Sequence, residues 1–129
     1  MYEYNIVKVN KVIDGDTVDL VIDLGFNIFR NEKIRLNRVD TPETNSSNEL
    51  EKKMGIESKI FVTEWLNNQS SLKVKTFKDD KYGRMLGEII GNESTCLNDV
   101  LLNQGYAWLY LGDTKTKDLN VLLEKRNKQ

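Results

Sequence analysis

Alternating hydrophobic and polar positions in the first forty residues predict three β-strands. Residues 4–12 are rich in β-forming side chains, and residues 17–22 alternate strictly, so one face of that second strand is expected to be buried. A turn at residues 24–27 leads into a third strand. We expect it to end near Val39, because Pro42 cannot donate a hydrogen bond to a ladder. The side chains expected to face the interior are Val18, Leu20, Ile22, Ile34 and Leu36.

The middle of the chain carries one long helical pattern. Apolar residues recur at helical spacing through residues 54–66. We expect this helix to begin near Gly55, since glycine is unfavourable inside a helix, and residues 44–53 to form a loop. The alternative start is Asn48 with Glu51, because that spacing matches a capping pair.

Two further strands and two short helices complete the pattern. Residues 72–77 and 84–90 read as strands, residues 97–101 as a short helix ended by Gly105, and residues 119–123 as a last helix. The order of three strands, a helix, two strands and two helices favours a single, mainly β domain of the α+β type. Its expected architecture is a five-stranded barrel of the OB type with about three helices.

Composition limits the chemistry more than it limits the fold. The chain has 129 residues, one cysteine and no histidine, so an internal disulfide and any Ser-His or Cys-His nucleophile are excluded. Carboxylates without histidine suit hard cations such as calcium or magnesium. The net charge of −1 gives no long-range attraction for nucleic acid, so a polyanion would have to be held by local cations.

The apolar runs are far shorter than the ~20 residues that span a bilayer. The first ten residues do not resemble a signal peptide. A cytoplasmic location is therefore the default expectation, with no membrane partner, and we expect a monomer.

Two acidic turns are the candidate metal ligands. The segment DGDT supplies Asp14 and Asp16, and DTPE supplies Asp40 and Glu43. Asp16 and Asp40 lie at the ends of neighbouring predicted strands, so a barrel can bring them together around a hard cation. The alternative is ordinary turn chemistry, in which each aspartate caps its own turn.

Two arginines are the candidate phosphate ligands. Arg35 faces away from its apolar neighbours, and Arg84 is the last residue of the segment DKYGR. A guanidinium group grips phosphate with two donors and stays charged at working pH. The alternative for each is an exposed strand residue in a salt bridge. Together with two acids for a cation and a third for water, they are the groups that phosphodiester cleavage requires.

The segments IDGDTV, IRLNRVDTPE and DKYGR, in this order, resemble the three motifs of the staphylococcal nuclease family. The segment LNDVLLNQGYAW is similar to a helix and the following strand of that family. The resemblance runs from about residue 6 to residue 110, and the single domain is taken as residues 1–129. The implied fold is the five-stranded OB barrel with three helices.

The resemblance also implies an ion and a reaction. Asp16, Asp40 and the backbone carbonyl of Thr41 would hold Ca²⁺, and Glu43 would position or deprotonate the attacking water. The implied reaction hydrolyses DNA or RNA, with single strands preferred, and leaves 3′-phosphate ends.

The remaining implied residues would contact the substrate. Arg35 and Arg84 would bind the scissile phosphate, and Arg84 would assist the departing 5′ oxygen. Lys81 and Tyr82 would contact a neighbouring phosphate. Tyr110 is the candidate for stacking on a base, and the alternative is that it belongs to the barrel core.

Several other residues allow more than one interpretation. Trp108 is interpreted as barrel core, and Arg38, placed in the third strand, has no assigned role. Lys73 and Lys75 point outward from their strand, where they either line the substrate path or form a solvated face.

Three functions compete at this stage. The first is a calcium-dependent nuclease, and the second is an inactive OB module that binds nucleic acid or a protein partner. The third, a structural calcium-binding domain, leaves both arginines unexplained. A pure binding module does not need Asp16, Arg35, Asp40, Glu43 and Arg84 together, so the nuclease is the favoured hypothesis.

Overall fold

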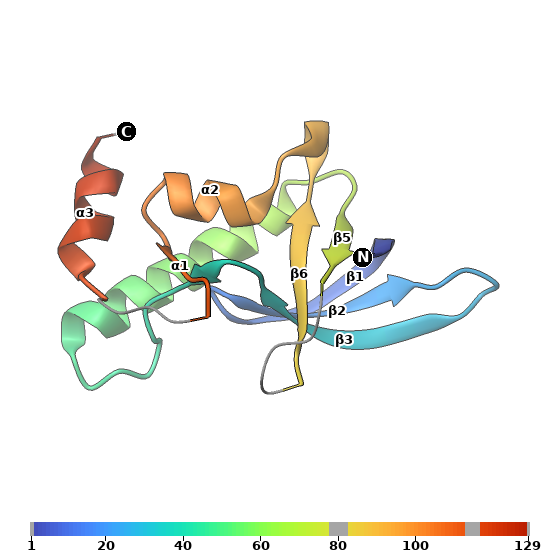
Figure 1. Ribbon diagram of the computed structural model, residues 1–129, viewed down its shortest axis with the longest axis horizontal. Coiled ribbons are helices and arrows are strands. Elements are labelled where there is room, and N and C mark those ends of the chain that lie inside the picture. Colours follow the sequence, from blue (N-terminus) through green and yellow to red (C-terminus); the bar gives the residue numbers. More distant parts are fainter. Residues whose placement is uncertain (1, 78–82, 113–116, 129) are drawn as a thin grey trace.

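Five strands close into a barrel in the order β1-β2-β3-β6-β5 (Figure 1). The computed structural model describes residues 2–77, 83–112 and 117–128. All neighbouring barrel strands are antiparallel except β3 and β6, which run parallel. The predicted five-stranded OB-type barrel is therefore confirmed. Its strands are β1 (Tyr2–Asp14), β2 (Thr17–Asp23), β3 (Phe29–Leu36), β5 (Lys73–Thr76) and β6 (Met85–Ile90).

The long first strand closes the barrel because it pairs with two partners. Residues 5–14 of β1 pair with β2, and residues 2–5 pair with β5. Its pairing with β2 shifts register in three places, between Ile6 and Lys8, Val9 and Lys11, and Val12 and Asp14. Such shifts bend a strand and increase its twist, which lets one strand curve around the sheet.

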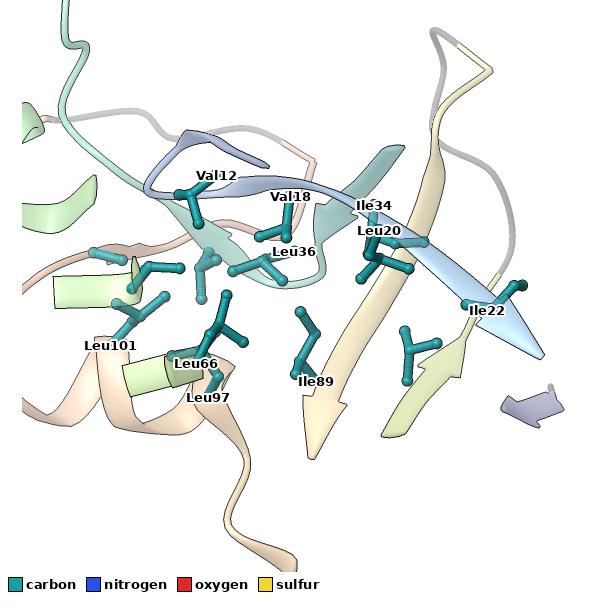
Figure 2. Packing of buried hydrophobic residues seen from close by; sticks show 14 residues of the cluster. Val12, Val18, Leu20, Ile22, Ile34, Leu36, Leu66, Ile89, Leu97 and Leu101 are labelled. Atoms are coloured by element: carbon teal, nitrogen blue, oxygen red, sulfur yellow. The ribbon is translucent and has the colours of Figure 1, made fainter. Parts of the chain in front are cut away.

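The barrel interior is filled by the predicted apolar face and by helical side chains. Val18, Leu20 and Ile34 are fully buried, and Figure 2 shows them directed toward the same interior as Leu97 and Leu101 from the helices. The period-two alternation of β2 and β3 thus corresponds to an inside and an outside of the barrel.

The helices gather at one side of the barrel, while the β2–β3 hairpin extends on the other (Figure 1). In the described part of the chain they are α1 (Glu49–Asn67), α2 (Leu97–Asn103) and α3 (Leu119–Asn127), and a short 3₁₀ helix, η1 (Asn92–Ser94), connects β6 to α2. None of the described helices has both the length and the apolar character needed to cross a membrane.

The predicted start of the long helix near Gly55 is wrong. Helix α1 begins at Glu49, and the side chain of its N-cap residue Asn48 accepts a hydrogen bond of 2.9 Å from the Glu51 amide. The capping pair is therefore the true start, and only the first part of residues 44–53 is a loop. Gly55 is tolerated inside the helix because the backbone of Pro42 and Glu43 packs against it.

The third strand also ends earlier than predicted. β3 stops at Leu36, and Arg38 adopts a left-handed conformation with φ of 69°, which turns the chain. A separate short strand, β4 (Val39–Asp40), then pairs with β7 (Trp108–Leu109). The Arg38 guanidinium forms salt bridges with Glu88 at 3.0 Å and Asp99 at 2.8 Å. Its role in the described structure is therefore to stabilise the turn between β3 and β4.

Trp108 is buried but does not belong to the barrel core. It packs with Met54 of α1 and Leu122 of α3 in a second, smaller apolar cluster. Its indole nitrogen donates a hydrogen bond of 3.0 Å to the Asp118 carbonyl just before α3. The apolar pattern indicated burial correctly, but the tryptophan anchors the last helix instead of filling the barrel.

Candidate active site

Helix α1 supports both acidic turns through two small residues. A β-carbon at Gly55 would lie 2.6 Å from the Pro42 carbonyl oxygen, so the DTPE turn rests directly on the helix backbone. A β-carbon at Gly15 would lie 2.9 Å from the β-carbon of Ser58, one helical turn further along. Glycine is required at both contacts because any larger side chain would push the turns away from the helix.

Asp16 is held by the neighbouring turn as well as by its own strand. Its Oδ2 accepts a hydrogen bond of 3.1 Å from the Thr41 amide, and its Oδ1 accepts one of 3.1 Å from the Thr17 hydroxyl. The Asp16 carbonyl accepts a further bond from the Leu36 amide at 2.8 Å. The bond from the Thr41 amide ties the DGDT segment to the DTPE segment.

Arg35 lies buried between the two aspartates. Its Nη2 is 3.5 Å from Asp16 Oδ2 and 3.7 Å from Asp40 Oδ1, while its Nη1 donates to the carbonyls of Leu36 at 2.9 Å and Val39 at 2.8 Å. Because the guanidinium side chain is only 10% exposed, this pairing is shielded from solvent. Arg35 is therefore not the exposed surface residue of the alternative interpretation.

The two aspartates converge as the sequence predicted. Both carboxylates approach one nitrogen atom of Arg35, although Asp16 precedes β2 and Asp40 ends β4. The side chains of Asp16 and Asp40 are 12% and 14% exposed, so both carboxylates are largely shielded from solvent.

One cavity of about 680 Å³ gathers the predicted site residues. Seven of the nine predicted residues line it, and the other two, Lys81 and Tyr82, lie outside the described residues. The Arg35 guanidinium lies 5.8 Å from the centre of the Tyr110 ring, a cation–π arrangement at the cavity wall. The seven are Asp16, Arg35, Asp40, Thr41, Glu43, Arg84 and Tyr110.

The two strand lysines lie elsewhere. Neither Lys73 nor Lys75 is among the residues that line this cavity, and Lys73 pairs with Glu3 at 3.8 Å. Their solvated-face interpretation is therefore the one that the described structure favours.

One charged residue of the cavity, Lys117, was missed by the sequence reasoning. Lys117 Nζ lies 3.2 Å from Asp40 Oδ2, although it is far from every motif in the chain. It sits in a polar stretch, TKTKD, that carries no motif of its own. Only the tertiary contact identifies it.

The donor set fits a hard divalent cation. Calcium accepts carboxylate, backbone carbonyl and water oxygens as ligands, and the cavity offers the first two together with space for water. The chain has no histidine, which would favour zinc. Within the described ranges no three acidic or cysteine side chains gather closely enough to hold an ion by themselves. Asp16 and Asp40 would therefore need backbone and water oxygens to complete the coordination of an ion.

The chain matches the family described as "Staphylococcal nuclease homologue" over residues 33–129. This range contains Arg35, Asp40, Glu43 and Arg84, while Asp16 lies before it.

Individual relatives show the same similarity at modest identity. An uncharacterised protein of Methanocaldococcus jannaschii is 33% identical over 99% of this chain and 70% of its own length. The endonuclease YhcR of Bacillus subtilis is 31% identical over 79% of this chain, which corresponds to only 9% of that protein. An uncharacterised endonuclease of Escherichia coli O157:H7 is 27% identical over 80% of this chain and 60% of its own length.

Proposed function

The chain belongs to the staphylococcal nuclease family, and on that premise we propose that it is a calcium-dependent nuclease that hydrolyses DNA, RNA or both. The observation that supports this most is the convergence of Asp16 and Asp40 on Arg35, in a cavity that Glu43 and Arg84 also line. Relatives named endonucleases support the same reaction class.

Asp16, Asp40 and the Thr41 carbonyl would hold the calcium ion. The hydrogen bonds that Asp16 accepts from Thr17 and Thr41 fix its carboxylate in place before any ion binds. A calcium ion held there would supply positive charge to stabilise the negative charge that accumulates on the scissile phosphate during hydrolysis.

The two arginines and Glu43 would carry the remaining chemistry. Arg35 is fixed by two backbone carbonyls, so its guanidinium is held in place at the cavity wall, where it would bind phosphate oxygens. Glu43 is exposed at the cavity wall and would orient the attacking water or accept its proton. Arg84, also exposed, would bind the phosphate and assist the departing 5′ oxygen, which leaves a 3′-phosphate end.

Tyr110, Lys81 and Tyr82 would bind the substrate outside the scissile bond. Tyr110 already lies against Arg35, where a stacked base would stay close to the bound phosphate. An accessible base favours single strands, because bases in a duplex are stacked on each other.

Product analysis tests this proposal. 5′-labelled single-stranded DNA and RNA are incubated with the protein and Ca²⁺, and the fragments are treated with phosphatase before gel separation. We expect shorter fragments whose mobility changes after phosphatase treatment, which identifies 3′-phosphate ends. Retarded but intact strands in a native gel would instead identify the inactive binding module.

A further inference from the structure

Two cations compete for the carboxylate of Asp40. Its Oδ1 lies 3.7 Å from Arg35 Nη2, and its Oδ2 lies 3.2 Å from Lys117 Nζ. Both oxygens of this proposed ion ligand therefore face a positive charge. An ion that binds to Asp40 has to share the carboxylate with these cations or displace one of them.

The two cations are held very differently. The Arg35 side chain is 10% exposed and is fixed by the carbonyls of Leu36 and Val39, whereas the Lys117 side chain is 42% exposed. A lysine ammonium is a mobile, strongly hydrated charge on a flexible stem. Lys117 is thus the cation that can leave Asp40 at low cost.

The backbone beside Lys117 is anchored, so its approach to Asp40 is a feature of the fold. The Asp118 carbonyl accepts the indole hydrogen bond of Trp108 at 3.0 Å, and the Asp118 side chain caps α3 by accepting from the Asn120 amide at 2.9 Å. Trp108 is also part of β7, which pairs with β4 at Asp40. The segment that carries Lys117 is therefore tied to the strand that carries Asp40.

The surroundings keep Lys117 charged. Burial acts to lower the pKa of Lys117, but the charge and hydrogen bond of Asp40, with contributions from Glu43 and Glu51, outweigh it and raise the pKa. Lysine is charged at neutral pH even without this shift, so an ammonium ion faces Asp40 at 3.2 Å.

We propose that Lys117 is a displaceable counter-ion of Asp40, which competes with the divalent ion for this carboxylate and so weakens ion binding. The inference rests on the proposed function, since it takes Asp40 as an ion ligand. Lys117 acts through Asp40 and is a positioning residue. Once displaced, its ammonium group remains at the cavity wall, where a substrate phosphate would be a new partner.

Calcium titration calorimetry tests the inference without any need for catalysis. The wild type is compared with Lys117→Met, which keeps an apolar stem and removes the charge, and with Lys117→Gln as a second variant. Lys73→Met is the matched control, because it removes one positive charge from an exposed lysine that pairs with Glu3 away from the cavity. Thermal unfolding confirms that each protein is folded.

We expect both Lys117 variants to bind Ca²⁺ about three- to tenfold more tightly than the wild type, the order of effect of one nearby charge in water. The difference should shrink at high salt, and Lys73→Met should bind like the wild type. If the folded Lys117 variants bind Ca²⁺ as tightly as the wild type or more weakly, the inference about Lys117 is wrong, but the proposed ion site stands. Binding by none of the proteins overturns it together with the proposed ion site.

Discussion

At the scale of single residues, the two arginines of the site differ in what they stabilise. Arg35 is buried, bonded to two carbonyls and paired with two aspartates, so it contributes to folding as well as to any chemistry. Arg84 lines the same cavity but is exposed to solvent. Removing Arg84 should therefore separate the loss of catalysis from a loss of stability.

Replacing Arg84 by alanine should cost about 3–4 kcal/mol of transition-state stabilisation, because a preorganised donor to the phosphate is lost. That corresponds to a fall of roughly 10²–10³-fold in kcat/KM, measured on a labelled strand, with little change in Tm. Arg30→Ala is the control, since Arg30 is an exposed arginine that pairs with Glu32 and does not line the cavity. Near-normal turnover of Arg84→Ala would mean that its proposed role is wrong.

Glu43→Gln should slow cleavage by roughly 10²–10⁴-fold, the usual contribution of a positioned acid or base. Calcium affinity, measured by calorimetry on the same protein, should stay unchanged because Asp16 and Asp40 remain. A variant that no longer binds calcium would show instead that Glu43 is an ion ligand.

At the scale of elements, α1 determines where the acidic turns lie. The DTPE turn packs on the bare backbone at Gly55, and the DGDT turn packs beside Ser58. Ser58 also donates a hydrogen bond of 2.7 Å to the Tyr106 carbonyl, so the same helix face is linked to the segment before β7. The helix thus contacts both acidic turns and the segment that leads through β7 to Tyr110 at the cavity wall.

Gly55→Ala tests this contact. Alanine favours the helix by up to ~1 kcal/mol over glycine. However, its β-carbon would meet backbone atoms of Pro42 at 2.6 Å and Glu43 at 2.7 Å. We expect a net destabilisation of roughly 1–3 kcal/mol in urea unfolding and slower cleavage, because Glu43 is displaced.

Ile56→Ala, at an exposed position of the same helix, is the control and should change neither quantity strongly. A Gly55→Ala protein that is more stable and equally active would contradict the close approach of the DTPE turn.

Asn48→Ala should lower the free energy of unfolding by about 1 kcal/mol, because the Glu51 amide loses its capping acceptor. The urea midpoint measures this change, with Asn67→Ala at the other end of α1 as the control. Asn48→Ser should retain most of the stability, since serine also caps. If alanine and serine behave alike, the cap contributes nothing to α1.

At the scale of the whole molecule, the sequence predicted what depends on local pattern. The alternation through Val18 and Leu20 identified the inner barrel face, since side-chain direction in a strand follows position alone. The start of α1 was missed because the poor helix propensity of Gly55 is overridden by packing against the DTPE turn, which no local pattern records. Trp108 was predicted to be buried, but an apolar residue does not reveal which of two cores it joins.

In the candidate site, too, the residues in local motifs were predicted and a residue placed only by tertiary contacts was not. Asp16, Arg35 and Asp40 were found because each lies in a short motif, and the structure brings them together; their roles remain predictions. Lys117 could not be found, since its contact with Asp40 depends on how α3 is anchored through Trp108. The net charge of −1 likewise did not predict a cavity lined by both cations and carboxylates, because a total charge says nothing about where the charges lie.

The most direct measurement is the cleavage rate of a labelled single strand by the wild type and by Asp40→Asn. Each is assayed with Ca²⁺, after chelation, and after Ca²⁺ is restored. We expect cleavage by the wild type that stops with chelator and returns with calcium. Asp40→Asn, purified in the same way, should be nearly inactive while folded. Cleavage that persists in chelator, or that Asp40→Asn retains in full, would contradict a calcium-dependent site built on Asp16 and Asp40.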